Sequence, residues 1–326
     1  MTTARRPATL DDVARAAGVS RSTASRVIAG TGFASPIARE RVHTAADQLG
    51  YVPNAAARAL VHGSGVRLLV AVTGTGPEAL DDSYLDQVVS SVARVCAPHG
   101  LGVTVEWVPL HAPGLLTRLV DDRAVAGLVL VNTTGALLDL VPRRLRGRAV
   151  SIGIGSATVP SVDIDNAAGT DALVRHLYAE GRRRIAMVTG PRWLACADRP
   201  VQAYRRLLGD AGLPVREVVG DFSAARGRLA AQEVLRRWPD TDAIVGISDA
   251  TALGVIGQLR ADGVQVPGDV AVTGFDDIPL ASATELTTAS HPVRRIARAA
   301  ATMVLEQRPV PGSTMFPSAP VLRASA

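Results

Sequence analysis

The sequence predicts a small all-helical module at the N-terminus, followed by an α/β core in which parallel sheets form two lobes. Three observations lead to this prediction. The first fifty residues contain short segments with helix-capping residues and turn glycines. From residue 66 onward, apolar runs of strand length alternate with helical stretches, which is the pattern of βαβ units. This alternation continues beyond residue 300 of the 326-residue chain, which is long enough for two lobes.

The N-terminal module is expected to hold three helices, over residues 10–17, 21–28 and 36–49. Thr9 can cap the first helix, and two acids follow it in the turn where the helix dipole favours negative charge. Gly18 turns the chain, and Ser20 can cap the second helix. Ser35 can cap the third helix, because Pro36 fits the first helical position.

A short connecting region follows the module. Residues 50–54 break the third helix, residues 55–61 are rich in alanine, and residues 62–65 have the composition of a flexible linker. We therefore expect a module over residues 1–53, a hinge over residues 54–65 and a core over residues 66–326.

The core is expected to contain two parallel sheets. The apolar, strand-like runs cover residues 67–73, 102–107, 126–131, 149–153, 184–189, 243–248 and 270–275. The main helical stretches cover residues 84–97, 170–179, 226–238, 251–261 and 294–306. Fully apolar strands that alternate with helices indicate sheets covered on both faces. The crossover between lobes would lie near residues 163–165, which gives one lobe of about 66–163 and 291–315 and another of about 164–290 and 316–326.

The charge of the chain is unevenly distributed. All 35 basic residues are arginine, and the region up to His62 holds eight of them against four acids, whereas the rest holds 27 against 26. A basic module on a near-neutral body is the charge pattern expected of a part that binds a polyanion, although a solvated surface can also be basic.

Several classes of protein are not indicated. Cys96 and Cys196 lie too far apart for a disulfide framework or zinc site, and the N-terminus lacks the apolar stretch of a secretory signal. The longest apolar runs, such as residues 68–72, are much shorter than a membrane span. The six histidines are dispersed, and there is no Gly-x-Ser-x-Gly motif. We expect a cytoplasmic protein without catalytic residues, metal or cofactor.

The strongest local signal is a pair of helices within residues 9–28. Small and apolar side chains at Val13, Ala17 and Val27 would face one another across the Gly18 turn, which holds two helices at a steep angle. The outer face of the second helix then presents four polar side chains: Arg21, Ser22, Ser25 and Arg26. Arginine can bond two acceptors of guanine, and serine can hold phosphates, so this helix suits a DNA major groove. The alternative is an ordinary helical hairpin with a polar face.

These residues resemble the headpiece of the lactose-repressor (LacI/GalR) family. The resemblance continues through residues 39–42, 49–54 and 57–60. It implies a sequence-specific transcriptional regulator, most simply a repressor, that binds a pseudo-palindromic operator as a homodimer. The implied base contacts are Arg21, Ser22 and Arg26, and the implied phosphate contacts are Thr9, Ser20, Thr23, Ser25 and Asn54.

In the hinge, the resemblance implies a helix over residues 54–61 that orders on DNA and enters the minor groove. Leu60 would act there as a wedge that kinks the central base step, with Ala57 and Arg58 beside it. So short a segment is unstable as an isolated helix, which fits folding on DNA. The alternative is a plain linker.

The resemblance also covers the core, through Asp249, Ala252, Gly254 and residues 162–166, 176–186, 188–191, 242–244, 266–267, 269–272, 274–277 and 286–288. It implies a two-lobed fold, similar to the periplasmic binding proteins for sugars, that closes on a small-molecule effector such as a sugar or related metabolite.

Ligands of open α/β sheets bind beyond the carboxyl ends of the strands, and four polar residues follow predicted strands in this way: Asn132, Arg192, Asp249 and Asp276. We expect both carboxylates to reach one cleft. The resemblance adds Phe222 as a stacking aromatic and Tyr84 as a residue from the first lobe. The alternative for Asp249 is a helix cap.

The core departs from the family at three positions. Ser248 stands where the family usually has asparagine, and Arg182 replaces a common histidine. The arginine that clamps ligands in the family aligns with Pro200, and Arg199 lies one residue earlier as a candidate substitute. The effector therefore remains open.

Two other functions are weighed against a regulator. Residues 74–79 follow a strand as Gly-x-Gly-x-x-Ala, with Glu106 at the end of the next strand, which resembles a dinucleotide fingerprint. Pro77 and the polar residues 81–83 would delay the helix that this fingerprint requires. A solute-binding protein would need a secretory signal and no headpiece.

Overall fold

The computed structural model describes residues 8–29, 33–49, 51, 66–81, 83–306 and 312–326. The chain forms two compact units, Met1–Ser64 and Gly65–Ala326. Each unit is described by itself.

The N-terminal unit contains the three predicted helices, which are α1 (Leu10–Ala17), α2 (Arg21–Ala29) and α3 (Pro36–Leu49). Thr9 and Asp12 form a capping box at the start of α1, and Gly18 ends the helix with a φ of 63°, a conformation that favours glycine. Buried side chains from all three helices, including Val13, Val27 and Val42, form the small core. The prediction of three helices is confirmed.

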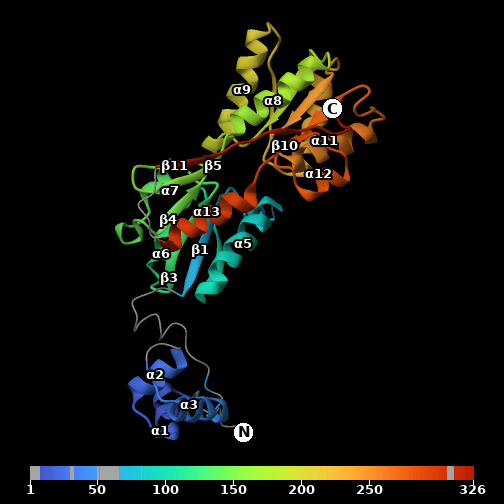
Figure 1. The fold of residues 1–326 in the computed structure, drawn as a ribbon. Helices are drawn as coiled ribbons and strands as arrows, with labels where there is room; N and C mark the ends of the chain where they lie inside the picture. Colours follow the sequence, from blue (N-terminus) through green and yellow to red (C-terminus); the bar gives the residue numbers. More distant parts are fainter. Residues whose placement is uncertain (1–7, 30–32, 50, 52–65, 82, 307–311) are drawn as a thin grey trace, which may run out of the picture. The chain divides into compact units, whose positions relative to one another are not determined.

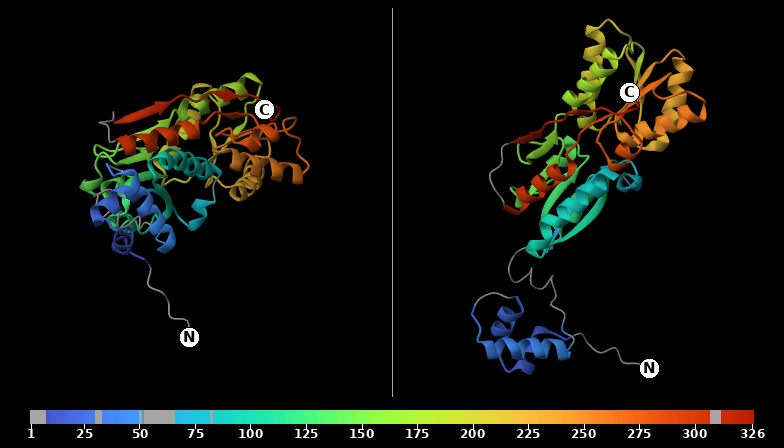
Figure 2. Two further views of the ribbon diagram at one scale, coloured as in Figure 1. Left: turned by 60° about the horizontal axis from the view of Figure 1, so that its bottom comes forward. Right: turned by 45° about the vertical axis from the view of Figure 1, so that its right-hand side comes forward.

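The first sheet of the core has six parallel strands in the order β11-β5-β4-β3-β1-β2. They are β1 (Arg67–Gly74), β2 (Gly102–Pro109), β3 (Val125–Val131), β4 (Ala149–Ile152), β5 (Ser161–Ile164) and β11 (Ser313–Phe316). Figure 2 shows α5 (Ser83–Cys96) beside α13 (Val293–Glu306). The consecutive residues Leu68 and Leu69 of β1 point to opposite faces of the sheet. Leu68 packs in an apolar cluster with α5 and α13, and Leu69 packs in another with α6 (Leu115–Asp121) and α7 (Gly135–Asp139). Both faces are thus covered, as the apolar strands predict.

The second sheet has four parallel strands in the order β7-β6-β8-β9. They are β6 (Ile185–Thr189), β7 (Arg216–Val219), β8 (Ala243–Gly246) and β9 (Ala271–Thr273), and a separate antiparallel pair joins β10 (Thr288–Ala289) to β12 (Pro320–Val321). Helices α8 (Asn166–Ala179) and α9 (Asp198–Asp210) contribute to one apolar cluster, and α10 (Ala224–Arg237) and α11 (Asp249–Ala261) to the other. A short helix, α12 (Pro279–Ala283), precedes β10.

The chain passes between the two sheets after β5, after β10 and after β11 (Figure 1). The first of these passages is at Asp165, between the end of β5 and the start of α8. The predicted α/β architecture with parallel sheets is confirmed. No helix in the described part of the chain is long and apolar enough to cross a membrane.

The sequence did not predict several elements: strands β5, β7, β10, β11 and β12, the short helices α6, α7 and α12, and the longer helix α9. β7 begins with Arg216 and Glu217, so it lacks the apolar start of a central strand; it is an edge strand, where charges are tolerated. Helix α9 contains Pro200, but a proline this close to the N-terminus of a helix removes no intrahelical hydrogen bond.

Candidate functional site

The first candidate site is the outer face of α2. Arg21, Ser22 and Arg26 are exposed on this helix, whereas Ala24 and Val27 on its other side are buried. Arg26 Nε donates to the carbonyl of Ser22 at 3.1 Å. Two arginines and a serine therefore share an exposed helix face, whereas Ser25, which was expected beside them, is half-buried.

The hydroxyl residues around α2 also shape the module. Ser20 Oγ accepts from the backbone N–H of Thr23 at 3.1 Å and lies 2.8 Å from Thr23 Oγ1. Thr9 Oγ1 donates to Asp12 Oδ2 at 2.6 Å. The sequence analysis expected the side chains of Thr9 and Ser20 to contact DNA phosphates. In this structure their hydroxyls cap the first turns of α1 and α2. The hydrogen bonds from Thr9 hold the pKa of Asp12 below its usual range.

Four of the expected DNA contacts belong to the hinge: Asn54, Ala57, Arg58 and Leu60. They lie outside the described residues.

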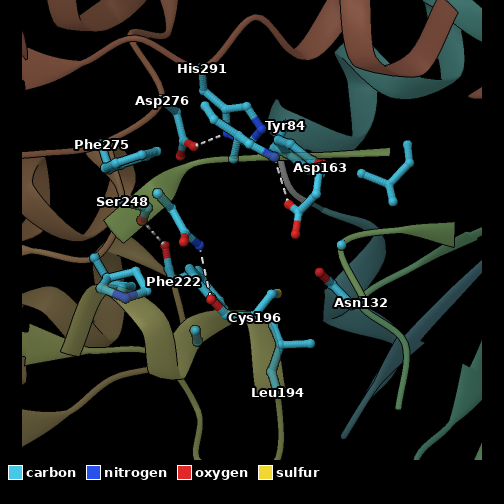
Figure 3. Close-up of a pocket in the computed structure, with 17 residues that line it drawn as sticks. Tyr84, Asn132, Asp163, Leu194, Cys196, Phe222, Ser248, Phe275, Asp276 and His291 are labelled. Carbon is cyan, nitrogen blue, oxygen red and sulfur yellow. Dashed lines mark hydrogen bonds and ion pairs between the residues drawn. The ribbon is translucent and has the colours of Figure 1, made fainter. Parts of the chain in front are cut away.

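The second candidate site is a cavity in the core at the carboxyl ends of strands from both sheets (Figure 3). From the first sheet and α5 it is lined by Tyr84, Asn132, Ile152, Gly153, Asp163 and Ile164. From the second sheet and its helices come Asn166, Leu194, Cys196, Ala197, Pro200, Phe222, Ile247, Ser248, Phe275 and Asp276, and His291 completes the wall. Apolar surface with a few polar groups is typical of a small-molecule site.

Asp276 and His291 form one polar part of this cavity. His291 Nδ1 lies 2.8 Å from Asp276 Oδ1, and Figure 3 shows the two side chains pointing toward one another. Burial raises the pKa of Asp276, and the hydrogen bond and charge of His291 oppose that rise. The ring of Tyr84 packs against His291 with centroids 5.2 Å apart. His291 follows β10 and precedes α13, so this cluster joins α5 of the first lobe to the turn after β9.

The backbone around the cavity holds its side chains in unusual conformations. Asn132, Phe222 and Asp276 have φ angles of 54°, 73° and 113°, in the region that favours glycine. Ser248 Oγ donates to the carbonyl of Phe222 at 3.0 Å, which fixes the turn that carries the aromatic ring. Non-glycine residues at positive φ are concentrated at functional sites.

The side chains of Asp163 in β5 and Asn166 at the start of α8 form the other polar part. Asn166 Nδ2 donates to the carbonyl of Cys196 at 2.9 Å, whereas its Oδ1 is buried and has no partner among the described residues. Asp163 Oδ2 accepts from Arg199 Nη2 at 2.5 Å, and Oδ1 accepts from the N–H of Ile164. The sequence analysis missed Asp163, Asn166 and His291 as cavity residues, since β5 and β10 were not predicted as strands. Their only signal was their position after short apolar segments.

The expectation that Asp249 lines the cleft is wrong. Asp249 is fully buried, its Oδ1 accepts from Thr288 Oγ1 at 2.6 Å, and its Oδ2 accepts from the N–H of Ile278 at 2.9 Å. Both oxygens therefore hold the turn after β9 and strand β10 rather than a ligand. Burial, with the nearby charge of Asp276, raises the pKa of Asp249 to about 7.

The two arginines expected in the cleft also lie elsewhere. Arg192 lines a separate hollow with residues of α9, β7 and α10, because the loop after β6 turns toward the edge of the sheet. Arg199 does not line the cavity in place of the arginine expected at position 200, since its guanidinium is bonded to Asp163 and lines a second hollow that Asp163 also borders. Tyr84, Asn132, Phe222 and Asp276 do line the cavity.

Residues 74–79, which resemble a dinucleotide fingerprint in sequence, are not followed directly by the helix that such a fingerprint requires. Residues Pro77–Leu80 form a short 3₁₀ turn after β1, and α5 begins only at Ser83. A pyrophosphate on this motif would need a helix N-terminus directly after the glycines.

Comparisons with known proteins cover both units of the chain. Residues 9–54 match bacterial regulatory proteins of the lacI family, and residues 174–326 match a periplasmic binding protein-like domain. The HTH-type transcriptional regulator CelR of Thermobifida fusca is 33% identical over 96% of this chain and 95% of its own length. The crystal structure of the Lac repressor dimer bound to operator and the anti-inducer ONPF covers 98% of this chain and 99% of its own, with a TM-score of 0.84 and 25% identity. A CelR–cellobiose complex covers 98% and 100%, with a TM-score of 0.68 and 29% identity.

Three observations point to the same family. The N-terminal unit has an exposed polar helix face, the core has a cavity between two parallel sheets, and the similarity extends along almost the entire chain. The protein belongs to the lacI family of bacterial regulatory proteins, as a DNA-binding transcriptional regulator controlled by a small-molecule effector.

Proposed function

We propose that this chain is a repressor that binds a pseudo-palindromic operator as a homodimer in the cytoplasm, and that a sugar or related metabolite in the core cavity changes its operator affinity. The observation that carries the proposal is the cavity lined by side chains from both sheets of the core. A ligand that touches both sheets binds one arrangement of the lobes better than another, and so shifts the equilibrium between them.

For DNA recognition, we propose that α2 enters the major groove. Arg21 and Arg26 would contact guanine acceptors with Ser22 beside them, because these side chains are exposed on one helix face. Thr9, Ser20, Thr23 and Ser25 would contact phosphates, and Asn54, Ala57, Arg58 and Leu60 would follow in the hinge. One recognition helix covers one half-site, so two copies are needed. The Lac repressor structure is a dimer on operator DNA, which supports this arrangement.

For effector recognition, we propose that Asp276 and Asn132 bond polar groups of the ligand while Phe222 packs against its apolar face. These residues line the cavity from the two sheets. The cellobiose complex of CelR supports a carbohydrate as the first class of ligand to try. We do not include Asp249, Arg192 and Arg199 among the proposed ligand contacts, because their side chains do not line the cavity.

A direct test combines ligand screening with operator binding. Thermal shift of the full chain would find binders among sugars and nucleosides, with cellobiose first, and fluorescence anisotropy would then measure operator affinity with and without each binder. We expect at least one binder to change operator affinity tenfold or more, as coupling energies of about 1–3 kcal/mol imply. Binders that leave operator affinity unchanged contradict the proposal.

A further inference from the structure

One ion pair at the wall of the core cavity joins the two lobes. Asp163 lies in β5 of the first sheet, and Arg199 lies in α9, which packs on the second sheet. Arg199 Nη2 donates to Asp163 Oδ2 at 2.5 Å. The side chain of Asp163 is only 9% exposed, and that of Arg199 is 34% exposed. The arginine nearest the cavity is thus already bonded to a carboxylate of this chain.

The remaining polar groups of the cavity are mainly acceptors. No arginine or lysine is among the described residues that line it, and its histidine is bonded to Asp276. Asn166 Oδ1 is buried without a partner among the described residues, and only one oxygen of Asp276 accepts from His291. These oxygens can accept hydrogen bonds from ligand hydroxyls. Two carboxylates, Asp163 and Asp276, also face the same space.

We infer that the Asp163–Arg199 pair is a specificity determinant, which makes the cavity select uncharged, hydroxyl-rich ligands and reject carboxylates and phosphates. This inference rests on the proposed function and names the ligand class of the same site. An anionic ligand gains a cation only by taking Arg199 from Asp163, which leaves a buried carboxylate unpaired. An anion that leaves the pair intact finds no unpaired arginine among the described lining residues and lies beside Asp276, and such a like-charge contact is unfavourable.

The test uses ligands in matched pairs that differ only in an acidic group. Glucose with glucuronate and glucose with glucose 6-phosphate provide such pairs, and calorimetry with the full chain measures each affinity. We expect the wild type to prefer the uncharged member by at least about tenfold. In Asp163→Asn, Arg199 is free to bond a ligand anion, so affinity for the anionic member rises about tenfold or more over the wild type.

The double variant Asp163→Asn/Arg199→Gln is the matched control. It lacks both charges of the pair, so the gain for the anionic ligands disappears if Arg199 provides it. Thermal denaturation verifies that each variant is folded. A wild type that prefers the anionic member overturns the inference, and so does a folded Asp163→Asn variant whose anion affinity equals that of the wild type.

Operator affinity is measured separately with the same ligands. A sugar that binds without changing operator affinity contradicts the proposed function, while the calorimetry still decides the ligand class. The two failures are therefore distinguishable.

Discussion

The two candidate sites of this chain are built in opposite ways. The exposed polar face of α2, which we propose contacts DNA, comes from one short stretch, Arg21–Ala29, and its arginines are exposed. The cavity of the core gathers residues between Tyr84 and His291, and its carboxylates are largely buried, with Asp163 paired to Arg199 and Asp276 to His291. Changes on α2 should therefore act through lost DNA contacts, whereas changes in the core should act through both the ligand and the fold.

The largest effect is expected for Arg26→Ala. Loss of a base contact costs about 1–3 kcal/mol per half-site, and a dimer meets two half-sites. Arg26 is exposed, so the variant should fold as the wild type does. Anisotropy titrations on operator and scrambled duplexes measure the change, with Thr23→Ala as the control that weakens both duplexes alike. Equal weakening by Arg26→Ala on both duplexes would show that Arg26 contacts phosphate.

Asp249→Asn is expected to change the pH dependence of the stability of the fold. Burial raises the pKa of Asp249 to about 7, so the folded chain keeps a proton that the unfolded chain has released above about pH 4. The wild type should therefore lose up to about 4 kcal/mol of stability from this group as the pH rises from 4 to 7. Denaturation midpoints at several pH values measure the slope, which should be smaller in Asp249→Asn. The same slope in both proteins would contradict this account.

Asp276→Asn should act mainly on the ligand. Replacing a charged acceptor removes about 1.5–3 kcal/mol of hydrogen bonding to a ligand hydroxyl. Calorimetry with the ligand found by screening measures the loss, which should exceed tenfold in affinity. Arg192→Gln is the control, because Arg192 is exposed and does not line this cavity. Equal losses in the two variants would show that the cavity is not the binding site.

The smallest effect is expected for Thr9→Ala. The capping box of Thr9 and Asp12 stabilises α1, and loss of such a cap costs about 1 kcal/mol. Hydrogen exchange of the full chain without DNA should show faster exchange in α1 and unchanged exchange in the core. Unchanged exchange in α1 would mean that the cap contributes little.

The same contrast explains what the sequence predicts. Caps such as Thr9, Ser20 and Ser35 act on the next few residues, so the three helices of the N-terminal unit follow from local patterns. Apolar runs likewise predict the central strands of the core. The short strand β5 has no such signal, because its burial depends on neighbours β4 and β11, and β11 lies far away in the sequence.

Side-chain roles in the core depend on contacts between distant segments. Asp249 was expected to face the ligand because it follows a strand, but it is bonded to Ile278 and Thr288 instead. His291 gains its place only because Asp276 and Tyr84 meet it from two other elements. Position after a strand identifies the edge of the sheet at which a ligand binds, but not which side chains reach it.

The most direct test of this account is the response of operator affinity to a saturating concentration of the screened effector. Operator titrations with and without effector would be made for the wild type, Asp276→Asn and Arg192→Gln. We expect the effector to change operator affinity in the wild type and in Arg192→Gln, and the change to be lost in Asp276→Asn at the same concentration, since the cavity couples ligand to DNA. An Asp276→Asn protein that responds to the same effector concentration as the wild type would contradict the assignment of effector control to this cavity.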